Sequence, residues 1–386
     1  MKLKHQTFIL VSVFVSILSQ APLFREKIGI ETQMLMLPFW LVTFCITLYQ
    51  NQCLKVSRTF VIYIQFFLII VGSTFLEIIS DNSYFFGFTK MIIMALLIFF
   101  IGAQSKNMFS DNWFRKLAYT YVMATLFLAI DIYFEYFIGY NFQVMGYIYR
   151  AKNSAGQILL TAVIFLLYLL EKRKKCFLKG LLIAFFILEI IIMRSRATIL
   201  SSLFIPITFF KNSYLKLRYK ILFIIFLIIV ITYVLINENV YNLIINNLLL
   251  NSNENISLKK IDLNMVSSNR ISTIRELPEL LNGKEFCGLG FPFYVDNVFA
   301  NAIGTYGLVI GILVCLLAIF PVLIIRRNYR RILFNKKNMY LQMIMLIYVF
   351  NGFFEGWAPF GPGAKCFLVW LLLGMLLSAD NKDLYD

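Results

Sequence analysis

The chain has 386 residues, of which 60% are hydrophobic, and its formal net charge is +16. A mean hydropathy of +0.78 excludes a soluble globular protein, because no soluble fold can hide that much apolar surface. The basic excess does not indicate nucleic-acid binding, since the Lys and Arg residues fall mostly between apolar runs instead of on one soluble face. The composition predicts a polytopic membrane protein built from helices, which satisfy their own backbone hydrogen bonds in lipid.

Many apolar runs approach the roughly 20 residues that a spanning helix needs, so we predict an all-α fold with about 12 transmembrane helices. The predicted spans are 7–24, 33–49, 59–79, 88–104, 117–138, 155–170, 177–193, 198–210, 221–236, 298–325, 339–354 and 366–378. The first resembles a signal peptide, but we expect it to stay uncleaved because further spans follow. The run 198–210 is short, whereas 298–325 is long enough to be bent or partly re-entrant.

The distribution of basic residues predicts the orientation of the chain. The densest clusters, 172–175 and 326–337, fall on the same side as the N-terminus, so the positive-inside tendency places both termini in the cytoplasm. One outer loop, 237–297, is long, polar and rich in Asn, and loops of this length usually carry function. We therefore predict a single membrane-embedded domain over 1–386, with 237–297 as a periplasmic loop within it.

Ionisable residues inside the predicted spans gather toward the outer side. They are Glu77, Lys90, Asp131, Glu135, Glu189 and Glu355. Charges inside spans are costly and suggest function. A transporter tends to place polar groups near the bilayer midplane, so their position near one surface favours binding or chemistry at the outer face over a transport pathway.

Two groups among these outer charges lead to specific expectations. Asp131 and Glu135 are four residues apart on one helix face, where they can address one cavity or one basic partner. Arg194 and Arg196 lie at the outer end of a span, although the positive-inside tendency favours basic residues on the inner side. The two arginines either pair locally with acids such as Glu189 or form an outward-facing anionic site.

Three segments at the predicted outer face carry a resemblance to a known family. The first is Arg150-Ala-Lys-Asn153-Ser-Ala-Gly156, directly before a span, and the second is Arg194-Ser-Arg196-Ala-Thr at a span end. In the third, Asn269-Arg270 and Arg275 precede Gly288-Leu-Gly290 and Asp296-Asn297, which lead through Gly304 and Gly307 into a helix. In order, spacing and outer location they resemble the O-antigen polymerase and O-antigen ligase superfamily, multispanning enzymes that transfer glycans from an undecaprenyl pyrophosphate carrier.

The departures from this family pattern favour a polymerase over a ligase. Ligases of the superfamily place a His beside the Asn at the end of the loop, where this chain has Asp296. The one histidine in the sequence, His5, lies at the predicted cytoplasmic N-terminus. An Arg-x10-Gly motif of some polymerases does not fit Arg270 or Arg275, which leaves the separate role of each open.

The resemblance implies roles for the outward-facing side chains. Arginines suit the pyrophosphate, because they are always charged and donate paired hydrogen bonds to phosphate oxygens. An outward carboxylate could serve as general base for the acceptor hydroxyl, with Asp296 first by motif position and Asp131 and Glu135 next. The alternative role of Asp296 is to cap the following helix. We predict Asp296, Arg194, Arg196 and Arg270 as catalytic residues, and Arg150, Arg275, Asp131, Glu135, Asn297 and Tyr294 as substrate-binding residues.

These expectations combine into one functional hypothesis with two alternatives. We predict a Wzy-type O-antigen polymerase, a glycosyltransferase of lipopolysaccharide or similar surface-glycan biosynthesis in a bacterial inner membrane. Its partners would be undecaprenyl-pyrophosphate-linked oligosaccharides and membrane lipid, with a chain-length regulator and a flippase as candidate protein partners. We expect no nucleic acid, no metal and no cofactor, since neither metal-ligand spacing nor an outer Asp-x-Asp motif is present. The alternatives are an O-antigen ligase and a flippase or transporter of lipid-linked oligosaccharide.

Overall fold

The computed structural model describes residues 2–29, 32–50, 60–80, 84–105, 110–138, 151–170, 176–211, 232, 270–289, 293–327, 336–361 and 364–378. Within these ranges every regular element is helical. The first half of the chain contains α1 (Lys2–Leu18), η1 (Leu23–Lys27), α2 (Thr32–Gln50), α3 (Phe60–Ser80), α4 (Tyr84–Gln104), α5 (Asp111–Ile132), η2 (Tyr133–Phe137) and α6 (Lys152–Leu170). The second half contains α7 (Cys176–Ile192), α8 (Arg196–Ser202), α9 (Phe204–Lys211), α13 (Arg270–Leu280), α14 (Val298–Arg327), α16 (Lys336–Asn351) and α17 (Ala364–Ser378).

The described helices have the length and apolar character of a membrane protein. Three regions, Asp111–Tyr136, Lys152–Leu170 and Val298–Ile324, are long and apolar enough to cross a bilayer, and several shorter apolar helices accompany them. Each predicted span coincides with a helix or a pair of helices, except 221–236, which apart from residue 232 lies outside the described residues. The described residues thus have the fold of an all-α membrane protein, whereas about 12 spans remain a prediction.

Two predicted spans have different bounds in the structure. The expected span 198–210 is broken at Leu203 into α8 and α9, because Pro206 has no N–H to donate to the carbonyl of Ser202. The expected span 7–24 also ends early, since α1 stops at Leu18 and a turn separates it from η1. The first break coincides with the polar pair Ser19-Gln20, which the predicted span included.

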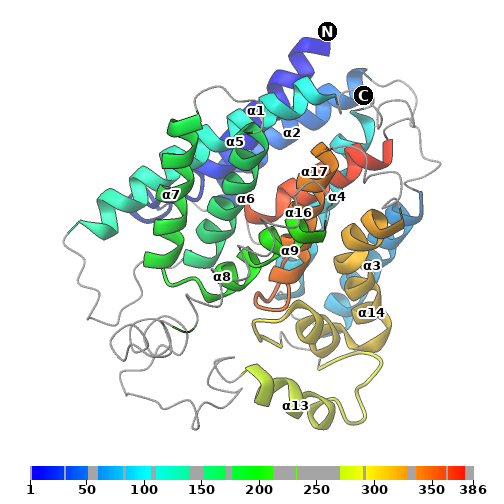
Figure 1. The fold of residues 1–386 in the computed structure, drawn as a ribbon. Coiled ribbons are helices and arrows are strands. Elements are labelled where there is room, and N and C mark those ends of the chain that lie inside the picture. The colour runs from blue at the N-terminus through cyan, green and yellow to red at the C-terminus, as the bar shows by residue number, and fades with distance from the viewer. Residues whose placement is uncertain are drawn as a thin grey trace.

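The helices form a bundle in which α6 is central (Figure 1). In the most apolar window of α6, 83% of the residues are buried, against 33% in α14. α6 contacts α5, α7, α8, α16 and α17. α1 begins and α17 ends at the upper end of the bundle, and α13 lies at the lower end. The two ends of the described chain therefore lie at one end of the bundle. That this end faces the cytoplasm remains a prediction.

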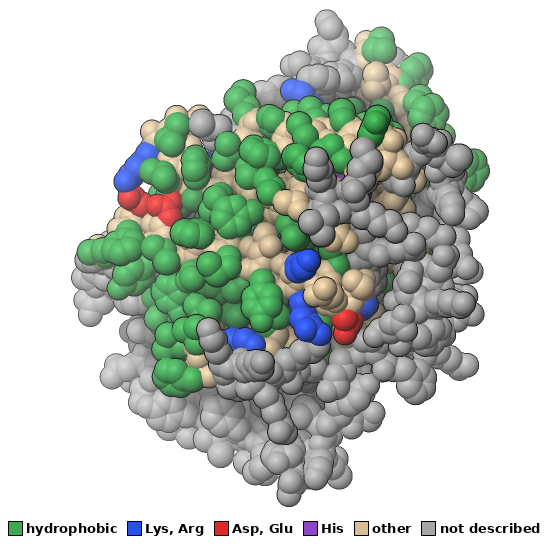
Figure 2. Space-filling view, turned by 90° about the horizontal axis from the view of Figure 1, so that it is seen from above, with side chains coloured by type: hydrophobic (Ala, Val, Ile, Leu, Met, Phe, Trp, Pro, Cys, Tyr) green, Lys and Arg blue, Asp and Glu red, His purple; other side chains and the backbone are tan. Residues whose placement is uncertain are grey.

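The outer surface of the bundle suits contact with lipid. Seen from the upper end, most described side chains on the surface are hydrophobic, and Lys and Arg occur in small groups (Figure 2). On α3, for example, Val61, Phe67 and Phe75 are all more than 60% exposed. A soluble protein rarely exposes contiguous apolar surface on this scale, so the hydrocarbon of a bilayer is the solvent that fits it.

Close helix contacts hold the bundle together. α4 and α17 approach so closely that a Cβ atom added to Gly102 would lie 2.3 Å from the carbonyl oxygen of Leu371. A Cβ atom on Gly374 would lie 2.4 Å from the carbonyl oxygen of Phe99. In lipid, where no hydrophobic force drives helices together, such small-residue contacts allow the backbones to pack by dispersion.

Hydrogen bonds between side chains connect α1 to α2. They join His5 to Thr47 at 2.7 Å, Ser12 to Thr43 at 2.8 Å, and the Trp40 indole to Ser16 at 2.8 Å. All six residues are buried, at no more than 1% exposure. Each of these six polar side chains thus has a partner on the facing helix.

α14 is not straight but folds back on itself. Gly307 adopts a left-handed conformation, with φ at 72°, that glycine tolerates and that interrupts the helix. Beyond it, the Cys315 sulfur lies 3.9 Å from the carbonyl oxygen of Phe299. In a straight helix residues this far apart would be separated by about 24 Å. The bend predicted for 298–325 is therefore present, as a helical hairpin.

Candidate functional site

The start of α6 meets the turn between α7 and α8. The Ser195 hydroxyl donates to Oδ1 of Asn153 at 3.0 Å and lies 2.7 Å from the hydroxyl of Thr198. Gly156 sits against this pair, and a Cβ atom there would lie only 2.6 Å from Oγ1 of Thr198. The first two segments that carry the family resemblance are thus in direct contact, although they are about 40 residues apart.

Three cationic side chains belong to this contact. Arg194 is 6% exposed and has a φ of 52°, a left-handed conformation that costs a non-glycine residue on the order of 1 kcal/mol. Arg196 is half-buried at the start of α8, and Lys152 is half-buried at the start of α6. Both arginines lie close enough to Lys152 to interact with it electrostatically. The arrangement concentrates positive charge at the ends of two helices, as an anion site requires.

Glu189, in the last turn of α7, does not neutralise this charge. Its side chain is 1% exposed, and neither carboxylate oxygen has a hydrogen-bond partner among the described residues. The expected local pairing of Arg194 or Arg196 with Glu189 is therefore wrong, since an ion pair would occupy these oxygens. The helix geometry holds the carboxylate inside the bundle while the arginines follow at the end of the helix.

Two further buried polar atoms lie on the facing part of α6. The Ser154 hydroxyl and the Gln157 amide nitrogen have no hydrogen-bond partner within the described chain. α6 and α7 are antiparallel neighbours, and Gln157 and Glu189 lie equally far, about 20 Å, from the ends at which the two helices connect. The amide oxygen of Gln157 accepts a hydrogen bond from Asn351 at 2.6 Å, which ties the end of α16 to the same level.

The described part of the predicted outer loop packs below the bundle against the hairpin of α14 (Figure 1). A small hydrophobic cluster of its own holds it there, formed by Leu277, Leu281, Leu289, Phe293, Val295 and Ala300. The Leu289 N–H donates to the carbonyl of Gly304 at 2.9 Å, and the Leu308 N–H donates to the carbonyl of Glu285 at 2.7 Å. Gly288 and Leu289, the described part of the Gly-x-Gly segment, are thus attached at the bend of α14.

Asp296 and Asn297 stand at the start of α14 and differ in role. Oδ1 of Asn297 accepts from the N–H groups of Phe299 and Ala300, both at 3.0 Å, so Asn297 is the helix cap. Capping, the alternative role considered for Asp296, is therefore carried out by its neighbour. Asp296 itself is partly exposed. The next turn is anchored by Asn301, which accepts from the Val295 N–H at 2.6 Å and donates to the Gly356 carbonyl at 2.9 Å.

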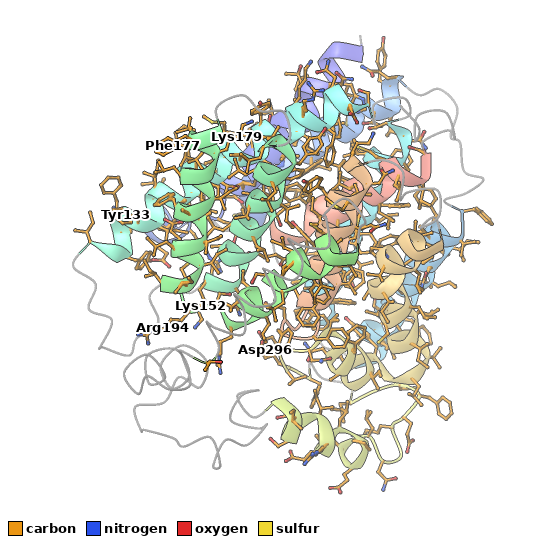
Figure 3. All side chains as sticks on the ribbon, viewed as in Figure 1. Tyr133, Lys152, Phe177, Lys179, Arg194 and Asp296 are labelled. Atoms are coloured by element: carbon orange, nitrogen blue, oxygen red, sulfur yellow. The ribbon has the colours of Figure 1, made fainter. Side chains whose placement is uncertain are left out.

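Lys152, Arg194 and Asp296 lie toward the same end of the bundle (Figure 3). Phe177 and Lys179, at the start of α7, lie toward the opposite end in the same view. The described parts of the three segments that carry the resemblance therefore lie toward the same end of the bundle. We define Lys152, Asn153, Arg194, Ser195 and Arg196 as the cationic site.

Asp131 and Glu135 belong to a different place, where α5 and η2 meet η1. Oδ2 of Asp131 accepts from the Leu23 N–H at 2.9 Å, and Glu135 forms an ion pair with Lys27. The hydrogen bond that Lys27 donates to Glu135 raises the pKa of Lys27 above its ordinary value. The sequence left open whether Asp131 and Glu135 face one cavity or one basic partner. The structure contains a basic partner, Lys27.

The remaining predicted residues are exposed or fall outside the description. Arg275 and Tyr294 are exposed, the latter at 71%. Arg150 and the side chain of Arg270 lie outside the described residues. Sequence reasoning did not propose Lys152, Asn153 or Ser195 as site residues, although all three lie inside the quoted motifs. Among the described side chains, no group of three His, Cys, Asp or Glu could hold a metal ion.

Comparison with known proteins gives no family assignment: no protein-family model matches the sequence, and no curated protein is significantly similar to it.

Proposed function

We propose that the protein is a polysaccharide polymerase of the Wzy type, which extends a surface glycan on a lipid carrier at the outer face of a bacterial inner membrane. The observation that carries this proposal is the contact between Asn153 and Ser195. It joins two segments whose resemblance to the polymerase and ligase superfamily was drawn from the sequence alone. The same contact gathers Lys152, Arg194 and Arg196.

The chemistry of glycan transfer needs positive charge at such a place. A sugar hydroxyl of the lipid-linked repeat unit attacks the anomeric carbon of the growing glycan, and the bond from this carbon to the pyrophosphate oxygen breaks. The pyrophosphate leaves with the bonding electrons, on its own carrier lipid. Preorganised arginines stabilise the negative charge that develops on it, most strongly where water is scarce. In this proposal Arg194 and Arg196 bind the leaving pyrophosphate, aided by Lys152.

The proton of the attacking hydroxyl needs an acceptor, and Asp296 is our candidate for the general base. Its carboxylate is partly exposed and the adjacent helix is already capped by Asn297. Arg270 and Arg275 on α13, together with Arg150, Asn297 and Tyr294, are proposed to contact the glycans or phosphates. Asp131 and Glu135 are weaker candidates, since both already bind groups of η1.

Alanine variants in the native host test the proposal. We expect Arg194→Ala, Arg196→Ala and Arg270→Ala variants, each present at the normal level in the membrane, to lose long-chain polysaccharide on a gel of surface glycans. Arg25→Ala is the matched control, because Arg25 is an exposed arginine on η1. Long chains made at normal length by the site variants would contradict the proposal.

The same host distinguishes the alternatives. A ligase of the superfamily would leave finished polymer on the carrier lipid when it is deleted, instead of shortening the chains. A flippase or transporter would strand single repeat units on the cytoplasmic side. Deletion that leaves outward-facing, lipid-linked single repeat units supports the polymerase.

A further inference from the structure

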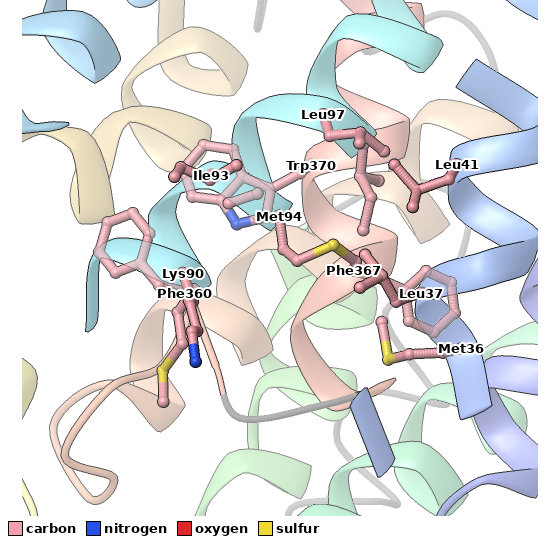
Figure 4. A pocket seen from close by; sticks show the side chains of 13 residues that line it. Met36, Leu37, Leu41, Lys90, Ile93, Met94, Leu97, Phe360, Phe367 and Trp370 are labelled. Atoms are coloured by element: carbon pink, nitrogen blue, oxygen red, sulfur yellow. The ribbon is translucent and has the colours of Figure 1, made fainter. Parts of the chain in front are cut away.

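A groove runs between α2, α4 and α17 on the side of the bundle (Figure 4). Its volume is about 270 Å³, near the lower end of the range for ligand sites. Almost all of its lining is apolar, and it includes Met94, Leu97, Phe367 and Trp370. This composition fits a hydrocarbon ligand.

The walls of the groove are open to the surroundings while its floor is closed. Leu37, Leu41 and Ile93 line it and are 36%, 43% and 46% exposed, whereas Phe367 and Trp370 are buried at 2% and 0%. The Trp370 indole N–H donates to the carbonyl of Pro359 at 2.8 Å, so only the ring is presented. A chain that lies in the surrounding bilayer could enter sideways without crossing polar groups.

Lys90 adds a charge at one end of the groove. It is the one charged residue among the described lining residues, it is exposed, and it lies beside Phe360 in the close-up (Figure 4). It belongs to the first turns of α4, the end that the topology places toward the outer face. A lysine at this level attracts the phosphate of a lipid whose chain lies deeper.

An aromatic path connects this end of the groove to the start of α14. Phe360 stacks on Trp370 with ring centres 5.4 Å apart and contacts Phe88 at 6.0 Å. Phe88 in turn contacts Trp357 at 4.5 Å and Tyr306 at 5.1 Å. The carbonyl of Gly356, in the same segment, binds Asn301 of α14. A headgroup at Lys90 would therefore lie at the end of the bundle that carries Asp296.

We propose that this groove binds the hydrocarbon chain of a polyprenyl pyrophosphate lipid, with the pyrophosphate at Lys90. The choice of a polyprenyl lipid over a phospholipid rests on the proposed function. The groove holds part of such a chain, and the rest remains in the bilayer. Lys90 is thus a binding residue separate from the cationic site.

A photoactivatable polyprenyl pyrophosphate tests this site on the full-length protein in lipid nanodiscs, by mapping the labelled peptides. We expect label on α4 and α17. Leu41→Trp fills the groove from α2 and should lower labelling roughly tenfold, the effect of about 1.4 kcal/mol. Val42→Trp is the matched control, since Val42 is similarly exposed at 48% but does not line the groove.

Lys90→Gln tests the charge without filling the groove. We expect its labelling by the pyrophosphate probe to fall roughly fivefold, while labelling by an uncharged polyprenol probe is unchanged. Lys116→Gln, an exposed lysine at the start of α5, is the control. Equal labelling of all these variants, or displacement of the probe by phosphatidylglycerol as well as by polyprenyl pyrophosphate, would overturn the assignment. The proposed function would survive that result if Arg196→Ala still abolished long-chain glycan.

Discussion

The α1–α2 interface and the α6–α7 interface both bury polar side chains between apolar helices, but they satisfy them differently. On the first, His5, Ser12 and Ser16 each have a hydrogen-bond partner on α2. In the α6–α7 pair, the Glu189 carboxylate on α7 and the Ser154 hydroxyl on α6 have none among the described residues. Buried polar groups in lipid are expensive without partners. The first interface is built for packing, whereas the α6–α7 pair retains buried polar groups to which no described residue bonds.

This difference separates buried polar groups that stabilise the fold from buried polar groups that are candidates for function. Glu189 precedes Arg194 by five residues, little more than one helical turn, on the helix that leads into the cationic site. Ionisable residues inside a membrane bundle are functional candidates by default. We infer that Glu189 supports the cationic site, and this inference can be tested against the fully paired interface.

The largest effect is expected at Glu189. Glu189→Leu removes a buried carboxylate without breaking a hydrogen bond, so the free energy of unfolding should not fall. The rate of polymerisation should fall at least about tenfold, because Glu189 is the one buried carboxylate among the described residues. Glu189→Gln keeps the size of the side chain and should be almost as slow. Polymerisation at the normal rate in both variants would make Glu189 a tolerated packing residue.

A smaller effect is expected where α6 meets α8. Gly156→Ala places a methyl group against the Thr198 hydroxyl, which must shift and disturb the Ser195–Asn153 bond. We expect polymerisation to slow several-fold, on the order of 1 kcal/mol in activation free energy.

The rescue of this effect provides the control. Thr198→Ala removes the colliding hydroxyl, so Gly156→Ala combined with Thr198→Ala should be no slower than Thr198→Ala alone. If the double variant instead shows the product of the two single effects on the initial rate, the two residues act independently and are not in contact.

Substitutions at the α1–α2 interface should change the stability of the protein and not its activity. Thr43→Val removes the interhelical bond to Ser12 and should lower the free energy of unfolding in mixed micelles by about 0.6 kcal/mol. Thr74→Val is the matched control, because exposed Thr74 bonds only to the carbonyl of Ile70 in its own helix. Surface-glycan length should be unchanged in both. A shortened glycan in Thr43→Val would place function at the α1–α2 interface too.

The smallest effect concerns Lys27 and Glu135. The hydrogen bond raises the pKa of Lys27 above its ordinary value of 10.5, so the stabilisation is present below that pH and is lost as the pH rises through the raised pKa. The pair is largely exposed, so the gain is small. Glu135→Gln should lower the thermal midpoint slightly at pH 8 and not at a pH above the raised pKa. An equal difference at both pH values would exclude the ion pair as its cause.

Much of the helical framework was predictable from the sequence. Apolar runs located the helices, and the length of 298–325 indicated the bend that Gly307 produces. The breaks at Leu18 and Leu203 were missed, because the spans were predicted from long apolar runs, although Ser19, Gln20 and Pro22 signal the first break and Pro206 signals the second. Local composition is therefore a better guide to where helices lie than to where they end.

The candidate site was predictable in its parts but not in its contacts. The motif residues were identified, yet that Asn153 bonds to Ser195 depends on the packing of α6 against the α7–α8 turn. Likewise, nothing local indicates that Lys27 pairs with Glu135, or that Asn297 caps α14 instead of Asp296. The groove was not predictable, since α2, α4 and α17 are far apart along the chain.

Reconstitution of the purified full-length protein with lipid-linked repeat units in proteoliposomes tests the central claim most directly. We expect the wild-type protein to form glycans of many repeats without added proteins, and the Arg196→Ala variant at equal density to form almost none. Polymer of the same length and amount from Arg196→Ala, or none from the wild-type protein with a lipid-linked unit from its own host, would contradict the account.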